Sequence, residues 1–204
     1  KWGASLASLP DLDGDGHDEL CVGGQAGVRV DLLFLSSDGA GGNFVARAGV
    51  RLSSDSGSAL PEDMRSRIVG GTSWGMSLAH LGDLDADGAP ELAIGAPYDD
   101  AGATDGGAIF ILSMVPAPPT VLFKAGSTVE LSADSEGDVG RLGVGTVEAG
   151  DWFGSDVDGV DDVDGDGVGD ALVGLRYDDD GGTGRGSVLV LLMEADGGVK
   201  GQQK

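Results

Sequence analysis

Twelve acidic residues stand in three arrays of identical spacing. In each array, carboxylates occupy positions 1, 3, 5 and 9 of a short segment rich in Asp and Gly. The arrays are Asp11, Asp13, Asp15 and Glu19; Asp83, Asp85, Asp87 and Glu91; and Asp162, Asp164, Asp166 and Asp170. Alternate positions of a tight loop can turn their oxygens to one side. Such hard ligands suit Ca²⁺, which takes about 6–8 oxygens, better than Mg²⁺, which keeps its waters.

The positions between the carboxylates also repeat. Position 6 is Gly in every array, where the chain must turn sharply, and position 7 can offer a backbone carbonyl as a further ligand. The position 7 residues are His17, Ala89 and Val168. Position 2 is apolar in every array, and we expect Leu12, Leu84 and Val163 to pack into the fold. Position 4 of the second array is Ala86 instead of Gly, which we expect to weaken that site.

A single Asp-Gly segment is most simply a solvated turn. Three segments with one spacing instead favour about three Ca²⁺ sites. The start of each array resembles an EF-hand loop, but that loop needs Glu at position 12 and flanking helices. Position 12 is here apolar, occupied by Val22, Ile94 or Val173. Tandem nine-residue calcium repeats are also excluded, because no such run occurs.

The arrays belong to a longer internal repeat. An aromatic-Gly pair precedes each array, and an apolar run ending in Gly follows it, without a gap in the alignment. The pairs are Trp2-Gly3, Trp74-Gly75 and Phe153-Gly154, and the final glycines are Gly23, Gly95 and Gly174. A second match downstream joins Tyr98-Asp99-Asp100 to Tyr177-Asp178-Asp179. The repeat units are predicted at 1–73, 74–152 and 153–204, the last incomplete at its C-terminal end.

Each repeat is predicted to contain four short strands, which in the second copy cover about 74–82, 91–96, 107–113 and 120–131. Short runs rich in Val and Ile, bounded by Gly and Asp, favour strands over helices. Successive residues of a strand face opposite sides of the sheet. Segments such as Leu92-Ala93-Ile94 and Ala171-Leu172-Val173 are apolar at every position, which indicates strands buried on both faces. The fold class is therefore all-β, with three four-stranded antiparallel repeats as blades of a β-propeller. Because propellers have about 4–8 blades, we expect further blades from the same polypeptide or from neighbouring chains.

Composition excludes several functions. With 12 basic and 35 acidic residues among 204, the formal net charge is −23, which disfavours nucleic acids and anionic membranes as partners. No apolar run is long enough to span a bilayer as a helix. The one cysteine, Cys21, cannot form a disulfide within the chain, and its apolar flanks predict a buried thiol.

The motifs resemble the FG-GAP repeat of integrin α-chain propellers. The literal matches are Phe153-Gly154 and Gly95-Ala96-Pro97, whereas the other copies have Gly23-Gly24-Gln25 and Gly174-Leu175-Arg176 in place of Gly-Ala-Pro. The resemblance implies a propeller of about seven blades with Ca²⁺ in the loops between strands one and two. It also implies an extracellular or cell-surface setting and a role in adhesion or ligand binding. Only three repeats are present, which leaves open any function that needs a closed ring.

A partner site is expected on the face opposite the metal loops, because the loops between strands two and three lie there. Exposed Tyr beside acidic and basic residues could recognise an extracellular protein or a glycan, although a Tyr packed on its neighbour in a solvated turn is the simpler interpretation. The candidates are Tyr98, Asp99, Asp100, Arg176, Tyr177, Asp178, Asp179 and Arg185.

Catalysis is not expected. The two histidines, His17 and His80, form no recognisable triad with a nucleophile, and paired carboxylates are too common to single out. Two alternatives remain open: a carbohydrate-binding, lectin-like propeller, and a propeller appended to a hydrolase such as a phospholipase, because FG-GAP repeats also accompany such domains.

Overall fold

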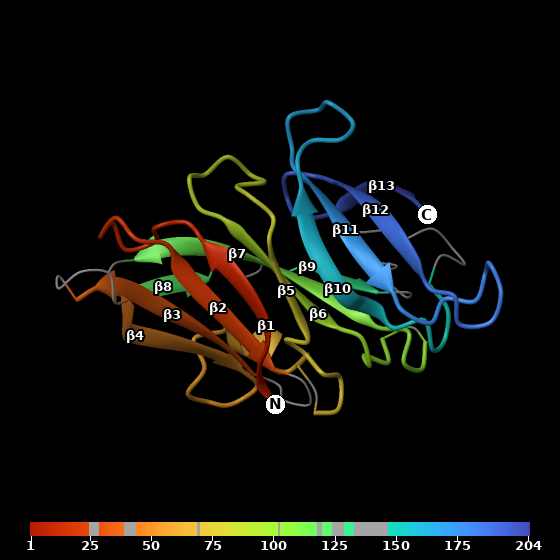
Figure 1. Cartoon of the computed structure of the whole chain (residues 1–204), viewed down its shortest axis with the longest axis horizontal. Coiled ribbons are helices and arrows are strands. Elements are labelled where there is room, and N and C mark those ends of the chain that lie inside the picture. Colours follow the sequence, from red (N-terminus) through yellow and green to blue (C-terminus); the bar gives the residue numbers. More distant parts are fainter. Residues whose placement is uncertain are drawn as a thin grey trace.

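The computed structural model describes residues 1–24, 29–38, 44–68, 70–101, 103–117, 120–123, 129–132 and 147–204. Its first sheet is a four-stranded antiparallel meander in the order β1-β2-β3-β4 (Figure 1). The strands are β1 (Trp2–Leu9), β2 (Glu19–Gly24), β3 (Arg29–Ser37) and β4 (Phe44–Ser53). A short helix, α1 (Glu62–Arg65), lies in the connection to the second sheet. Among the described residues, no helix is long and apolar enough to cross a membrane.

The second sheet has five strands. They are β5 (Ser77–His80), β6 (Glu91–Ala96), β7 (Ala108–Ala117), β8 (Thr120–Phe123) and β9 (Val129–Ser132). The fourth strand expected at 120–131 is divided, because β8 pairs with the end of β7 and β9 pairs with its beginning. Residues 124–128 of that expected strand, like Gln25 of the first repeat, lie outside the described residues.

The third sheet repeats the meander in the order β10-β11-β12-β13. Its strands are β10 (Phe153–Val160), β11 (Asp170–Leu175), β12 (Ser187–Met193) and β13 (Val199–Gln203). The predicted all-β class with antiparallel repeat sheets is confirmed. The three sheets do not close into a ring within the described ranges.

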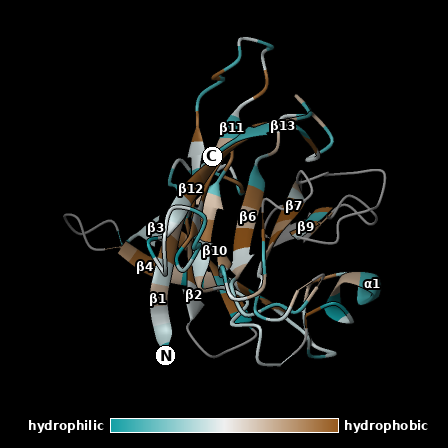
Figure 2. Cartoon of the chain, turned by 90° about the vertical axis from the view of Figure 1, so that its right-hand side faces the viewer, coloured by the Kyte–Doolittle hydropathy of each residue, from teal (hydrophilic) through white to brown (hydrophobic). Residues whose placement is uncertain are grey.

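The sheets stack side by side with their first strands together. Strand β5 contacts β1 on one side and β10 on the other. Figure 2 shows that apolar residues follow strands such as β6, whereas α1 and the loops that it colours are largely polar. One apolar core lies between the first and second sheets, and another between the second and third. The sheets therefore pack face to face, as blades do.

The second sheet is buried on both faces. Leu92 and Ile94 of β6 enter the first core, whereas Ala93, at the other parity, enters the second. The third sheet differs: Ala171 and Val173 are buried, but Leu172 between them is only half-buried. The prediction of burial on both faces is thus correct for Leu92-Ala93-Ile94 and wrong for Leu172, because no sheet among the described residues covers that face of β11.

Close backbone approach explains two of the repeated glycines. The Ser5 hydroxyl donates to the Gly75 carbonyl at 2.7 Å, and the Ser77 hydroxyl donates to the Gly154 carbonyl at 2.8 Å. A Cβ on Gly23 would lie 2.2 Å from the Gly75 oxygen, and one on Gly95 would lie 2.2 Å from the Gly154 oxygen. The pairs Trp74-Gly75 and Phe153-Gly154 are therefore the points where the second and third sheets each join the sheet before them.

Candidate metal centre

Each acidic array forms the loop between the first two strands of its sheet. The loops follow β1, β5 and β10, and position 9 begins β2, β6 or β11. All three loops lie at the same end of their sheets, because the three meanders run in the same sense. The strands thus hold the two ends of every loop, as the sequence predicts.

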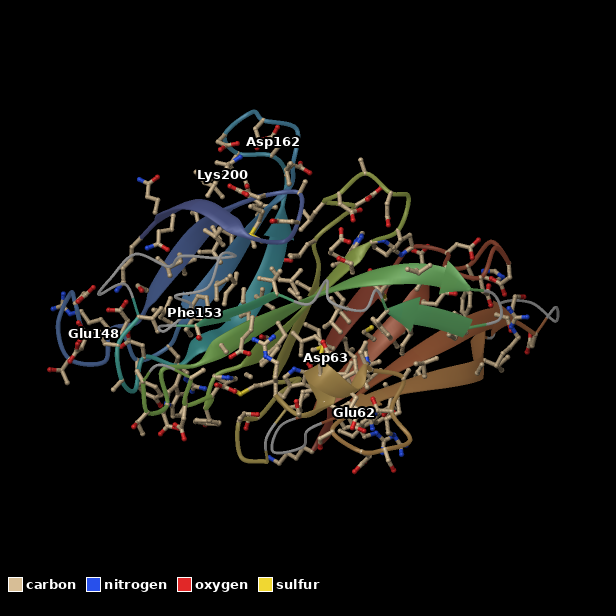
Figure 3. All side chains as sticks on the ribbon, turned by 180° about the vertical axis from the view of Figure 1, so that it is seen from behind. Glu62, Asp63, Glu148, Phe153, Asp162 and Lys200 are labelled. Carbon is tan, nitrogen blue, oxygen red and sulfur yellow. The ribbon has the colours of Figure 1, made fainter. Side chains whose placement is uncertain are left out.

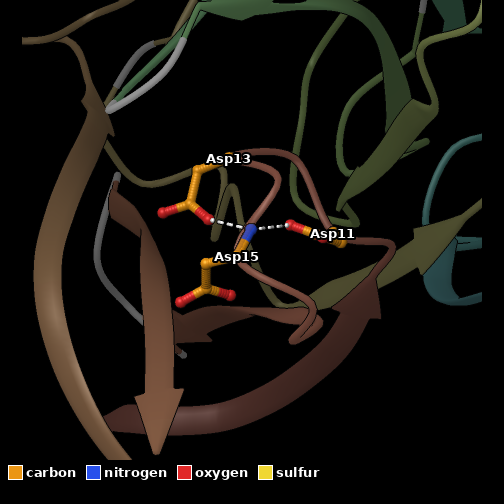
Figure 4. A group of neighbouring side chains, drawn as sticks. All are labelled: Asp11, Asp13 and Asp15. Carbon is orange, nitrogen blue, oxygen red and sulfur yellow. Dashed lines mark hydrogen bonds between the residues drawn. The ribbon is translucent and has the colours of Figure 1, made fainter.

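Asp11 organises the first loop (Figure 4). Its Oδ1 accepts hydrogen bonds from the Gly14 and Asp15 amides at 2.7 and 3.1 Å, and its Oδ2 accepts one from the Gly16 amide at 2.8 Å. The Asp15 amide also donates to Asp13 Oδ1 at 3.2 Å. These bonds fold the loop over the first carboxylate, and carboxylate oxygens of Asp11, Asp13 and Asp15 lie within 4.8 Å of one another.

The second and third loops repeat this arrangement. Asp83 accepts from the amides of Asp87 and Gly88, and Asp162 accepts from those of Gly165, Asp166 and Gly167. Position 6 has positive φ throughout: 88° at Gly16, 89° at Gly88 and 95° at Gly167. Carboxylate oxygens again gather within 4.8 Å, in the groups Asp83, Asp85, Glu91 and Asp162, Asp164, Asp170.

Position 4 separates the second loop from the others. Gly14 and Gly165 adopt φ of 79° and 83°, and Ala86 is held at 56°, in the same left-handed region. A Cβ is disfavoured there by roughly 1–2 kcal/mol. The second loop thus adopts its fold against a local cost that the other two avoid.

The residue at position 9 anchors its loop from below. Glu19 accepts the Leu12 amide at 3.2 Å, Glu91 accepts the Leu84 amide at 2.6 Å, and Asp170 accepts the Val163 amide at 2.7 Å. The other oxygen of Glu19 and of Glu91, Oε1, is buried without a hydrogen-bond partner. A buried carboxylate oxygen without a donor is costly, and a cation would satisfy it. In the third loop, the shorter Asp170 instead accepts the Met193 amide at 2.9 Å.

Burial and backbone donors shift the carboxyl pKa values in opposite directions. Burial raises the pKa of Glu19 to about 7 and that of Glu91 to about 6. At position 1, amide donation from Gly16 lowers the pKa of Asp11, and donation from Gly167 lowers that of Asp162. In the first two loops, position 9 is therefore a buried carboxyl group whose ionised form needs a positive charge nearby. In the first and third loops, backbone amides keep the position 1 carboxylate ionised.

Two basic residues that the sequence analysis did not identify reach these loops. Arg47 of β4 binds Asp13 and Asp15, at 2.9 and 2.5 Å. Lys200 of β13 binds Asp164 and Asp166, and Figure 3 places it beside the loop of Asp162. Each base comes from the fourth strand of the same sheet, so only the folded sheet brings it to the acids.

The residues present fit a divalent, oxygen-preferring cation. Three convergent carboxylates are available in each loop. Glu19 adds a buried unpaired oxygen beside the first group, and in the second loop the unpaired oxygen belongs to Glu91, a member of the group itself. The position 7 amides of His17, Ala89 and Val168 donate to the position 5 carboxylates at 2.9–3.0 Å. That the backbone carbonyls of these position 7 residues act as metal ligands remains a prediction. Two of the three position 2 residues are buried, but Val163 is exposed, contrary to expectation.

A known family of protein repeats has a sequence model that matches the second of these loops and its flanking strands. The family described as the FG-GAP repeat matches residues 74–112, from the aromatic-Gly pair through the second loop into β7. Residues 74–112 are an FG-GAP repeat. The first and third sheets carry the same arrangement of aromatic-Gly pair, acidic loop and final Gly.

Two integrin α-chains are similar to this chain. Integrin alpha pat-2 of Caenorhabditis briggsae is 36% identical over 110 residues, which are 52% of this chain and 8% of that protein. Integrin alpha-PS2 of Drosophila melanogaster is 30% identical over 137 residues, 63% of this chain and 9% of that protein. The matched part thus spans less than a tenth of either relative.

The ends of the sheets opposite the acidic loops carry an aromatic cluster. Trp152 lies between Tyr98 and Tyr177, with ring centroids 4.4 Å from each, and the Arg176 guanidinium lies 5.6 Å from the Tyr177 ring. Both tyrosines therefore pack on a neighbour, although Tyr177 remains 43% exposed. Trp152, which directly precedes the third aromatic-Gly pair, was not among the predicted site residues.

The acidic members of this face divide into two kinds. Asp99 and Asp178 are buried and close their own loops, accepting the amides of Ala101 and Asp180. Asp178 also binds Ser187 and Lys204. Asp100, Asp179 and Arg185 are exposed. A pocket of about 570 Å³ lies beside Tyr98, lined in part by Asp99, Asp100 and Arg67, and Arg67 pairs with Glu130.

Proposed function

We propose that this chain is a calcium-stabilised FG-GAP propeller module that serves in extracellular adhesion or ligand binding. One observation carries the calcium assignment: three carboxylates of each array converge in all three loops, on the same strand connection of three sheets. They stand at positions 1, 3 and 5 in the first loop and at positions 1, 3 and 9 in the other two. Repetition supports a ligand, because an isolated acidic turn needs none. About three Ca²⁺ ions per chain are proposed.

The protein groups have separate tasks in this proposal. The carboxylates at positions 1, 3 and 5 supply oxygens, and the position 7 carbonyl completes the loop's contribution. Position 9 ties the loop to the second strand and, in the first two repeats, presents its buried oxygen. The amide donors to Asp11, Asp83 and Asp162 hold the loop closed around this space. When bound, Ca²⁺ would neutralise the repulsion among these acids.

The stabilisation should be measurable. Extracellular calcium modules have Kd values of about 10⁻⁴–10⁻³ M. With free Ca²⁺ at about 1 mM and a Kd of about 10⁻⁴ M, each site adds roughly 1.4 kcal/mol to the free energy of unfolding. Cytosolic Ca²⁺ would leave such sites empty, which supports an extracellular or cell-surface location, as do the integrin names of the relatives.

A Ca²⁺-dependent melt tests the proposal. Three sites give about 4 kcal/mol, which corresponds to roughly 10 °C in Tm for a chain of this length. We expect EDTA to lower the Tm by about this amount and excess Ca²⁺ to restore it, whereas Mg²⁺ restores little. A Tm that is the same in EDTA and in Ca²⁺ would refute the calcium assignment.

The partner face is proposed at the aromatic cluster and the adjoining pocket. Tyr177, Arg176 and Arg185 offer stacking surface and positive charge, while Asp100 and Asp179 offer exposed carboxylates beside them. This combination suits an extracellular protein or glycan better than a chemical transformation, and we propose a binding module without catalysis. Glycan arrays and immobilised matrix proteins would identify the ligand class. The Tyr98→Ala, Tyr177→Ala double variant should lose that binding and keep its Ca²⁺-dependent Tm shift.

A further inference from the structure

The two bases that reach the metal loops come from the same structural feature, a β-bulge in the fourth strand. The register of β3 and β4 shifts next to Leu35, and Arg47 is the extra residue of β4 at this point. The register of β12 and β13 shifts next to Met193, and Lys200 is the extra residue of β13. Counted from the pairing of the second strand with the third, both bulges fall in the same place. Bulges re-aim a side chain, and here each turns a base toward the acidic loop of its own sheet.

The sequence of the second repeat has a base at the corresponding position. Met114 of β7 is the equivalent of Leu35 and Met193, and it pairs with Phe123. In the first and third sheets, the base directly follows the residue that stands in the place of Phe123. In the second repeat the next residue is Lys124, which lies outside the described residues. Lysine and arginine make up only 12 of 204 residues, so a base at one position of all three repeats indicates a shared task.

Each described base binds one pair of carboxylates, those at positions 3 and 5 of its loop. Arg47 Nη2 donates to Oδ2 of Asp13 at 2.9 Å and to Oδ2 of Asp15 at 2.5 Å. Lys200 Nζ lies 2.9 Å from Oδ2 of Asp164 and also binds Asp166. In both loops one nitrogen thus bridges two carboxylates, as a metal ion held between them would.

The two oxygens of these carboxylates have different roles. Oδ1 of Asp13 accepts the Asp15 amide at 3.2 Å, and Oδ1 of Asp15 accepts the position 7 amide at 3.0 Å. The third loop repeats this division, because Asp166 accepts the position 7 amide through Oδ1 and binds Lys200 through Oδ2. The loop amides thus use Oδ1, and the base uses Oδ2, the oxygen that positions 3 and 5 would otherwise give to a metal ion.

We propose that Arg47 and Lys200 are built-in substitutes for Ca²⁺, which the ion must displace when it binds. The charge of each base offsets the repulsion between positions 3 and 5, so the loop keeps its closed shape at low Ca²⁺. The same contact opposes Ca²⁺, because a base and a metal ion compete for the same oxygens. This inference rests on the proposed calcium function and deepens it: the bulge residue of the fourth strand sets the calcium affinity of its loop.

The first test isolates one loop and removes its base. A parent chain with Asp85→Asn and Asp164→Asn keeps the first loop intact, so calorimetry reads the Ca²⁺ affinity of that loop. Adding Arg47→Gln to this parent should raise the affinity about two- to fivefold, the range expected for an exposed ion pair. Adding Arg47→Lys instead keeps a positive charge at the bulge and should leave the affinity within about twofold of the parent.

Thermal melts of the otherwise native chain give a second readout. Arg47→Gln should lower the Tm in EDTA by about 1–4 °C, because the carboxylates lose their base. In saturating Ca²⁺ the Tm should match that of the native chain, because there the ion has displaced the base already. Arg51→Gln is the matched control: Arg51 lies on the same strand and is equally exposed, but it pairs with Asp31. It should lower both Tm values alike and leave the Ca²⁺ affinity unchanged.

Two results would overturn the inference. One is an affinity of the first loop that Arg47→Gln leaves unchanged or weakens, which would show that the base does not give way to the ion. The other is a loss of Tm that is the same in EDTA and in saturating Ca²⁺. The native chain separates this inference from the proposed function. If the native chain takes up no Ca²⁺, the calcium assignment itself fails and the inference falls with it. If the native chain takes up Ca²⁺ but Arg47→Gln does not tighten binding, the displacement alone fails.

Discussion

Replacing Gly95 with Ala should separate the second and third sheets. The new Cβ would lie 2.2 Å from the Gly154 carbonyl oxygen and 2.1 Å from Ser77 Oγ. An ordinary contact needs about 3.4 Å or more, so the third sheet must retreat by over 1 Å or the strand must distort. Overpacking of this kind costs about 1–3 kcal/mol. Losing the hydrogen bond from Ser77 to Gly154 adds about 0.5–1.5 kcal/mol.

The expected loss is therefore about 2–4 kcal/mol in the free energy of unfolding. This corresponds to a fall of roughly 5–15 °C in Tm for a chain of this length. Urea titration and thermal melts in saturating Ca²⁺ measure both quantities. Gly174→Ala is the matched control: it occupies the same register of the third sheet, where an added Cβ meets ordinary contacts. We expect it to stay within about 0.5 kcal/mol of the native chain.

The comparison of these two alanine variants decides whether the glycines serve the interface. Equal destabilisation by Gly95→Ala and Gly174→Ala would refute the reasoning, because it would show that the residue serves the strand and not the junction. A Gly95→Ala chain as stable as the native one would refute the calculated collision itself.

Three further changes test the loops and the first sheet. Ala86→Gly should relieve the strain of the left-handed backbone conformation in the second loop and stabilise the chain by about 1 kcal/mol, as measured by urea titration. Gly14→Ala should have the opposite effect on the first loop. A loss of stability in Ala86→Gly would contradict this reasoning. Lys200→Gln removes a cation that competes with Ca²⁺ for the carboxylates of the third loop, so it should raise the Ca²⁺ affinity of that loop by roughly two- to fivefold in calorimetry. The control Lys1→Gln, at an exposed residue away from the loop, should leave the affinity unchanged. An unchanged or weaker affinity in Lys200→Gln would contradict the competition. Burial acts to raise the pKa of Asp31, but hydrogen bonds from Arg29, Trp2 and Arg51 outweigh it and hold that pKa below its usual value. The ionised Asp31 thus stabilises the fold above the unfolded-state pKa of about 3.9, and this contribution is lost as the pH falls through the lower folded-state value. Asp31→Asn should accordingly reduce stability at neutral pH and flatten its fall in acid, and a parallel acid profile would oppose this.

Spacing alone predicted the loops and the repeat. Identical positions of Asp and Gly must give similar local turns, so the three loops and the positive φ at Gly16, Gly88 and Gly167 followed from local chemistry. The apolar residues at successive positions of β6, which face opposite sides of the sheet, likewise predicted a sheet covered on both faces. These features depend on residues close together in the chain, which is why the sequence is sufficient for them.

Features that depend on a neighbouring sheet were harder to predict. Val163 matches Leu12 and Leu84 in sequence, but its exposure depends on which sheet lies beside its loop. Arg47 and Lys200 meet the acids only because strand four returns alongside strand one's loop, a contact across more than 30 residues. The role of Trp152 as the centre of the aromatic cluster also depends on the junction between two repeats.

The partner residues could be only partly anticipated. The sequence grouped Asp99 with Asp100, and Asp178 with Asp179, because they are adjacent and chemically alike. The fold separates each pair: the first carboxylate is buried within its loop, and the second is exposed. Adjacent residues in a turn face different surroundings, and composition does not reveal which one turns inward. The exposed member of each pair is thus the better candidate for contact with a partner.

Calcium titration of the metal-free chain by calorimetry tests the central claim most directly. The account predicts about three Ca²⁺ ions per chain, with Kd values of about 10⁻³ M or lower. It also predicts the loss of one ion for each loop in which position 3 is neutralised, by Asp13→Asn, Asp85→Asn or Asp164→Asn. A chain that takes up no Ca²⁺, or one whose uptake is unchanged by all three substitutions, would contradict the account.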